Sequence, residues 1–177
     1  GGAVEEVANL TQSLRRHAGR PLLFASDLER GAGQQFKGLA KLPPQMAMAA
    51  CPRAVELVRE AGRATARDAK RAGINLVFAP LSDVNTEPKN PIINVRSFSD
   101  DPAVVSRLSV EWIKGAQETG VLACAKHFPG HGATIEDSHV HLARGADNPE
   151  IQREFHLPPF EAACRAGVGS VMTAHIT

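Results

Sequence analysis

The stretch "RAGINLVFAPLSD" at residues 71–83 contains the pattern on which the fold prediction rests. A helical segment ends in a glycine, a short apolar run follows, and a polar side chain closes the run. The run is continuously apolar rather than alternating, which is typical of a parallel strand buried on both faces. The same order recurs in "HAGRPLLFASD" (17–27), "ETGVLACAKH" (118–127) and "RAGVGSVMTAH" (165–175). We therefore predict four parallel strands, each preceded by a helix.

Each copy places a glycine where the C-terminus of a helix needs a left-handed residue. These glycines are Gly19, Gly73, Gly120 and Gly167. The segments between the apolar runs have the periodicity of amphipathic helices. We expect helices over 3–17, 51–70 and 102–118, and a fourth that starts after Asn148.

Two helix starts have strong local signals. Asp101 is the expected N-cap of the third helix, and Pro102 stands in its first turn. The tripeptide Asn148-Pro149-Glu150 repeats this signal before the fourth helix, which we expect Pro158-Pro159 to break. Trp112 lies on an apolar helical stripe and is expected in the core.

Strands that alternate with helices indicate an α/β fold with a parallel sheet and right-handed crossovers. Doubly wound sheets and barrels both bind ligands at the carboxyl ends of their strands. The long, polar loops after the strands favour the barrel, and no GxGxxG or GxxxxGKS/T motif follows the first strand. A complete (β/α)₈ TIM-type barrel needs about 250 residues. We therefore predict that 1–177 is a partial segment of one barrel domain, with about four βα units.

Composition excludes several classes of function. A formal net charge of +1 and the lack of a Lys/Arg cluster argue against a nucleic-acid partner. No apolar run approaches the roughly 18 residues that a membrane span requires. The three cysteines have no CxxC spacing, which favours a reducing compartment. We expect a cytoplasmic location; a removed signal peptide would make it periplasmic or secreted. The sequence leaves the oligomeric state open.

Polar residues follow the predicted strands. Asp27 and Glu29 follow the first, and carboxylates there bind metal, bind sugar hydroxyls or cap a loop. Asp83 after the second strand is expected to be structural. Lys126 after the third has three interpretations: an ion pair with a neighbouring carboxylate, a cation for substrate oxygens, or a Schiff-base amine. The simplest partner for Arg96 is the adjacent acidic pair at 100–101.

Histidines are dense after the third strand, where His127, His131, His139 and His141 surround Asp137. The His139-x-His141 pair could hold a metal, although metal-binding pairs of this kind are expected after a first strand. A hydrolytic triad is the second interpretation, but the sequence has no GxSxG motif to supply an activated serine. In the third interpretation, Asp137 orients His139, which then acts as acid and base near neutral pH.

The motif "KHFPGHG" (126–132) followed by "DSH" (137–139) resembles glycoside hydrolase family 3. The likeness is greatest to the bacterial branch of β-N-acetylglucosaminidases, which trims muropeptide-derived and related N-acetylglucosaminides in peptidoglycan recycling. Four further segments resemble the family in the family's order: "LLFASDLERG" (22–31), "NLVFAPLSDVN" (75–85), "NVRSFSDDP" (94–102) and "VMTAHI" (171–176). The resemblance covers nearly the whole chain.

The resemblance implies a retaining exo-β-N-acetylhexosaminidase that acts on a carbohydrate substrate, a terminal N-acetylglucosaminide. It assigns four residues to binding of the terminal sugar: Asp27, Arg96, Lys126 and His127. It assigns His139 to the general acid/base and Asp137 to its partner, and it leaves His131 a loop-shaping part. It implies no metal and no organic cofactor.

The chain departs from the family pattern in two places. An arginine that often contacts the sugar falls on Gln35, which opens the question of sugar and aglycone preference, and Arg30 is the candidate to compensate. The family's nucleophilic Asp follows the strand after "VMTAHI", so we predict that these residues alone do not hydrolyse an aryl N-acetylglucosaminide. The alternatives are a family 3 β-glucosidase, β-xylosidase or phosphorylase, a metal-dependent amidohydrolase, and a non-catalytic sugar-binding barrel.

Overall fold

The structure, a computed structural model, describes residues 2–135 and 148–176. Its four strands form one parallel sheet in the order β1-β2-β3-β4. The strands are β1 (Ala25–Ser26), β2 (Leu76–Val77), β3 (Leu122–Phe128) and β4 (Ser170–Thr173). Because the spatial order equals the chain order, each crossover leads to the neighbouring strand, as in a barrel. The predicted α/β fold, a partial segment of a TIM-type barrel, is confirmed.

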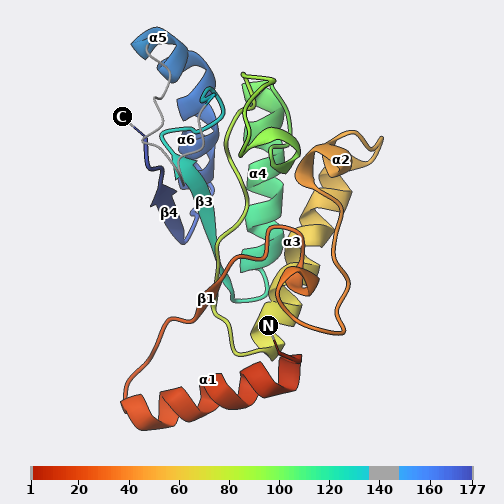
Figure 1. Cartoon of the computed structure of the whole chain (residues 1–177), viewed down its shortest axis with the longest axis vertical. Coiled ribbons are helices and arrows are strands. Elements are labelled where there is room, and N and C mark those ends of the chain that lie inside the picture. The colour runs from red at the N-terminus through yellow and green to blue at the C-terminus, as the bar shows by residue number, and fades with distance from the viewer. Residues whose placement is uncertain (1, 136–147, 177) are drawn as a thin grey trace.

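Helices alternate with the strands along the chain (Figure 1). They are α1 (Val4–Ala18), α2 (Gln45–Ala49), α3 (Ala54–Arg71), α4 (Pro102–Gln117), α5 (Pro149–Ile151) and α6 (Leu157–Arg165). Short 3₁₀ turns at Ala32–Gln34 and Asn94–Arg96 and a π turn at Gln152–His156 complete the described elements. Helix α4 packs against α3 on one side and α6 on the other, and α1 lies across the far end of α3. No helix among the described residues is long and apolar enough to cross a membrane.

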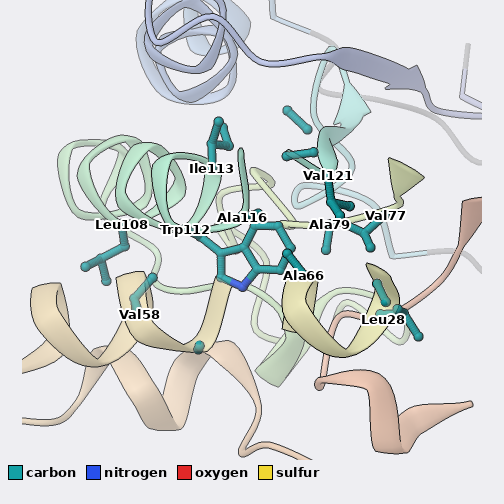
Figure 2. Close-up of a cluster of buried hydrophobic side chains, with 14 of the residues drawn as sticks. Leu28, Val58, Ala66, Val77, Ala79, Leu108, Trp112, Ile113, Ala116 and Val121 are labelled. Carbon is teal, nitrogen blue, oxygen red and sulfur yellow. The ribbon is translucent and has the colours of Figure 1, made fainter. Parts of the chain in front are cut away.

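The core between α3, α4 and the sheet is built around Trp112, which has no exposed surface. Val58 and Ala66 of α3 lie on one side of its indole, and Val77 of β2 lies on the side of the sheet (Figure 2). The helices approach closely because each has a glycine at the crossing. A Cβ atom at Gly62 would collide with the carbonyl of Trp112, and one at Gly115 with the carbonyl of Arg59. Trp112 is thus a core residue, as predicted.

The local signals set most helix ends where they were expected. The glycines that precede the four strands all have positive φ, at 61° for Gly19, 78° for Gly73, 84° for Gly120 and 74° for Gly167. The side chain of Asp101 accepts a hydrogen bond from the backbone N–H of Ala103 at 2.7 Å and so caps α4 as predicted.

The break expected at Pro158-Pro159 lies just before the two prolines, where the π turn Gln152–His156 separates α5 from α6. Helix α6 begins at Leu157 and passes through both prolines. They lie in its first turn, where backbone N–H groups have no partner within the helix and a missing donor costs nothing. Helix α2 (Gln45–Ala49) lies within the long loop expected after the first strand and was not predicted.

Candidate active site

A cavity of about 530 Å³ opens at the carboxyl ends of the strands. Its wall includes all four residues assigned to sugar binding, Asp27, Arg96, Lys126 and His127, together with Glu29, Gln34, His131 and His175. These residues come from segments after β1 and β2 and from the ends of β3 and β4. The parallel sheet brings together residues distant in the chain, such as Lys126 and Asp27, which are 99 positions apart.

Lys126 lies on β3 with its side chain only 3% exposed. Its ammonium nitrogen is 2.7 Å from Asp27 Oδ1 and 2.6 Å from Glu29 Oε1. A buried ammonium needs such partners to offset its desolvation. Donation to two carboxylates leaves no lone pair for attack on a carbonyl carbon, so the ion-pair interpretation fits and the Schiff-base one does not. The Asp27 side chain is 51% exposed, so it faces the cavity while it holds Lys126.

Glu29 joins Lys126 to Arg96. Its two oxygens accept hydrogen bonds from Arg96 Nη2 at 2.8 Å and Nε at 3.0 Å, a bidentate pair. Burial by itself raises the pKa of Glu29, but Arg96 and Lys126 outweigh it, so the pKa is lowered overall. The prediction that Arg96 pairs with the acidic residues at 100–101 was wrong, because its guanidinium binds the carboxylate of Glu29, 67 residues away.

Asp83 is fully buried and holds the turn that follows β3. Its Oδ2 lies 2.8 Å from Nδ1 of His127, and both its oxygens accept from the backbone N–H of His127 at 3.1 Å. Its Oδ1 also accepts from the backbone N–H of His131 at 2.7 Å. Burial raises the pKa of Asp83, but the bonds from His127 and His131 more than offset this and lower it. Asp83 is therefore structural, as expected, and it holds His127 in the cavity wall through Nδ1.

His131 lines the cavity but is only 3% exposed. Its Nδ1 lies 2.8 Å from the hydroxyl oxygen of Thr134, and burial lowers its pKa. This agrees with the loop-shaping part predicted for it. Burial favours a neutral ring, which suits a structural residue better than a charged ligand for substrate.

The predicted acid/base pair, Asp137 and His139, lies outside the described residues, as does His141 of the metal interpretation. Within 2–135 and 148–176, no three His, Cys, Asp or Glu side chains form a group that could hold a metal ion. The roles of Asp137 and His139 stay predictions.

Neither Gln35 nor Arg30, the two positions discussed as departures from the family pattern, lies in the wall of the cavity. Gln35 is exposed, whereas its neighbour Gln34 lines the cavity. The Arg30 guanidinium donates to the carbonyl of Leu42 at 3.1 Å and is not part of the cavity wall. Arg30 is thus not placed to replace a sugar-binding arginine.

Sequence reasoning named Glu29 as a candidate after the first strand but did not assign it to the site, and it missed the cavity positions of Gln34 and His175. A signal existed for Glu29, because its spacing from Asp27 places both carboxylates just after β1. His175 ends the fourth copy of the strand pattern, as His127 ends the third. Nothing local distinguishes Gln34 from Gln35.

Comparison with known proteins supports the resemblance to glycoside hydrolase family 3. The model of the family described as "Glycosyl hydrolase family 3 N terminal domain" matches residues 3–177. A beta-hexosaminidase of Xylella fastidiosa is 37% identical over 97% of this chain and 52% of its own length. The chain thus spans about half the length of the curated relatives it matches.

Solved structures agree. A glycoside hydrolase family 3 beta-N-acetylglucosaminidase from Paenibacillus sp. superimposes with a TM-score of 0.93 at 38% identity, over 99% of this chain and 34% of its own. NagZ from Neisseria gonorrhoeae, in complex with N-trifluoroacetyl-D-glucosamine, gives a TM-score of 0.89 at 31% identity, over 98% of this chain and 53% of its own. The chain therefore belongs to glycoside hydrolase family 3, and its residues 3–177 match the N-terminal domain of that family.

Proposed function

We propose that the protein is a retaining exo-β-N-acetylhexosaminidase that releases terminal N-acetylglucosamine. The observation that carries the proposal is the convergence of Asp27, Arg96, Lys126 and His127 on one cavity. Sugar hydroxyls are both donors and acceptors, so a terminal sugar is oriented best by fixed groups of both kinds. Asp27 supplies acceptor oxygens, and Lys126 and His127 supply nitrogens.

The named relatives support the sugar class. Several are beta-hexosaminidases, and the Neisseria gonorrhoeae structure contains an N-acylated glucosamine. We extend that preference to this protein and assign it to the recycling of peptidoglycan fragments. Its three cysteines are free thiols, which is consistent with the cytoplasmic location that we propose.

Cleavage of a glycosidic bond passes through an oxocarbenium-like state. In the proposed mechanism, His139 with Asp137 protonates the leaving oxygen and later activates water, in place of the usual carboxylic acid. The nucleophile is the Asp that the family resemblance places after the strand following "VMTAHI" (171–176), and it forms the covalent glycosyl-enzyme. The charged network of Asp27, Lys126 and Glu29 holds the sugar while these groups act on it.

The full-length enzyme tests the acid/base assignment. His139→Ala should slow hydrolysis of substrates with poor leaving groups by far more than hydrolysis of nitrophenyl substrates, which need little protonation. Equal losses on both would contradict the acid role.

Activity that persists in a chelator would argue against the metal-dependent alternative, and the 1–177 segment alone should show no turnover.

A further inference from the structure

Asn90, in the long segment between β2 and α4, is 1% exposed. Its side-chain oxygen accepts hydrogen bonds from the backbone N–H groups of Ile92 at 2.9 Å and Ile93 at 2.8 Å. The carbonyls of the same two residues accept from Arg96. That of Ile92 binds guanidinium Nη1 at 3.0 Å, and that of Ile93 binds the backbone N–H at 2.8 Å. The Asn90 oxygen therefore holds the two residues whose carbonyls support Arg96.

The side-chain nitrogen of Asn90 binds a different wall of the cavity. It donates to the carbonyl of His131 at 2.8 Å and to the hydroxyl oxygen of Thr134 at 3.3 Å. The same hydroxyl oxygen lies 2.8 Å from Nδ1 of His131. A backbone bond of 3.1 Å from the N–H of Glu87 to the carbonyl of Gly132 runs between the same two segments. The nitrogen of Asn90 thus anchors the turn that begins at His127.

We propose that Asn90 is a positioning residue of the sugar-binding site. One amide sets the place of Arg96 relative to the turn that carries His127 and His131. All four of its hydrogen-bonding positions are used, two as acceptor and two as donor, so its orientation is determined by both segments at once. Its effect on turnover rests on the proposed function, whereas its effect on the two segments does not.

Two substitutions distinguish the effect of the Asn90 acceptor oxygen from the effect of its donor nitrogen. Asn90→Asp keeps the acceptor for Ile92 and Ile93, removes both donors and sets a carboxylate oxygen against the carbonyl of His131. It should release the turn at 127–134 and leave the support of Arg96 in place. Asn90→Ala should release both.

In the full-length enzyme with an aryl N-acetylglucosaminide, Asn90→Ala should lower kcat/KM by about 10- to 100-fold, with a higher KM and a lower kcat. Asn90→Asp should lower kcat and raise KM by less than Asn90→Ala does, because Arg96 keeps its place and only the turn with His127 is released. Wild-type kinetic constants in both variants would overturn the proposal.

Asn75 provides a matched control. Its side chain makes the same kind of bridge, with Oδ1 accepting from the N–H of Phe24 at 2.7 Å and Nδ2 donating to the carbonyl of Leu22 at 3.0 Å. It lies at the other end of β2, away from the cavity. Asn75→Ala should lower Tm and leave kcat/KM within about twofold of the wild type. The proposal is wrong if Asn90→Ala behaves in the same way.

Thr134→Val is a second probe, in case the Asn90 variants do not fold. It removes the hydroxyl that Asn90 and His131 share at nearly constant volume, and it should lower kcat as Asn90→Asp does. An unchanged kcat in a folded Thr134→Val protein would also overturn the proposal.

Amide hydrogen exchange needs no substrate and so separates this proposal from the proposed function. Exchange should become faster in both 92–97 and 127–134 for Asn90→Ala, and in 127–134 alone for Asn90→Asp. If the wild-type enzyme does not hydrolyse N-acetylglucosaminides, the proposed function fails and the exchange pattern still decides. Unchanged exchange in both segments would show that Asn90 positions neither.

Discussion

At the scale of single residues, charge neutralisation around Glu29 decides the shape of the cavity wall. Glu29 is 8% exposed and binds Lys126 and Arg96 at once. Among the described residues, neither cation forms an ion pair with a second buried carboxylate, since the other partner of Lys126 is the half-exposed Asp27. The position of both sugar-binding cations therefore depends on one carboxylate that need not touch the sugar.

We expect Glu29→Gln to lower the free energy of unfolding by about 3 kcal/mol at pH 7, because it leaves two cations partly uncompensated in a buried site. The effect should depend on pH. The folded pKa of Glu29 is below its ordinary value of 4.5, so its stabilisation is complete above that value and is lost as the pH falls through the folded pKa. Urea unfolding between pH 7 and pH 3 should show the two proteins converging in acid.

Glu161→Gln is the control for this measurement. Glu161 pairs with Arg165 at 3.4 Å, but both side chains are exposed, at 63% and 72%. Exposed pairs of this kind contribute little, so the change should stay within about 0.5 kcal/mol. A Glu29→Gln effect no larger than this would contradict the charge-neutralisation argument.

At the scale of elements, the close crossing of α3 and α4 supports the sheet from behind. Gly62 and Gly115 let the backbones approach to the point where a methyl group would collide with a carbonyl oxygen of the partner helix. Trp112 fills the space beside this crossing (Figure 2). The position of α4 matters for the site, because the segment with Arg96 leads directly into this helix.

Gly115→Ala should therefore destabilise the protein, although alanine is the better helix former by about 1 kcal/mol. We expect a net loss of about 1–3 kcal/mol from overpacking, measured by denaturant unfolding. Arg107→Ala, at an exposed position of the same helix, is the control and should change stability by about 0.5 kcal/mol or less. A Gly115→Ala protein more stable than the wild type would show that the helices can separate without cost.

At the scale of the whole molecule, β4 is an edge strand of the described sheet (Figure 1). An apolar groove of about 580 Å³ lies beside it, with Phe128, Leu157, Phe160 and Val171 in its wall. Phe128 and Val171 are each 39% exposed. Open strand edges next to apolar surface promote association.

We expect the 1–177 segment, expressed alone, to self-associate through this edge as its concentration rises. Val171→Lys should shift it toward the monomer, because a charged edge disfavours pairing. Leu10→Lys on α1 makes the same change at another exposed apolar residue, 58% exposed, and should not alter association. Sedimentation velocity over a range of concentrations distinguishes these outcomes; a monomer at every concentration would contradict the prediction.

The sequence by itself determined the features that depend on local backbone geometry. The glycine before each strand, the cap at Asp101 and the continuous apolar runs are local signals, because their hydrogen bonds and dihedral angles involve residues a few positions apart. They are sufficient for the α/β class, whereas the choice of a barrel also needed the long polar loops after the strands. The motif at 126–132 was sufficient to identify the family.

Only the tertiary structure decided which side chains meet. Arg96 has carboxylates four and five positions away, yet it binds Glu29, which is 67 residues away, because the parallel strands bring their carboxyl ends to one edge. Lys126 reaches Asp27 across 99 residues for the same reason. Pairing across a sheet depends on strand order and register, and the local sequence around a charged residue determines neither of them.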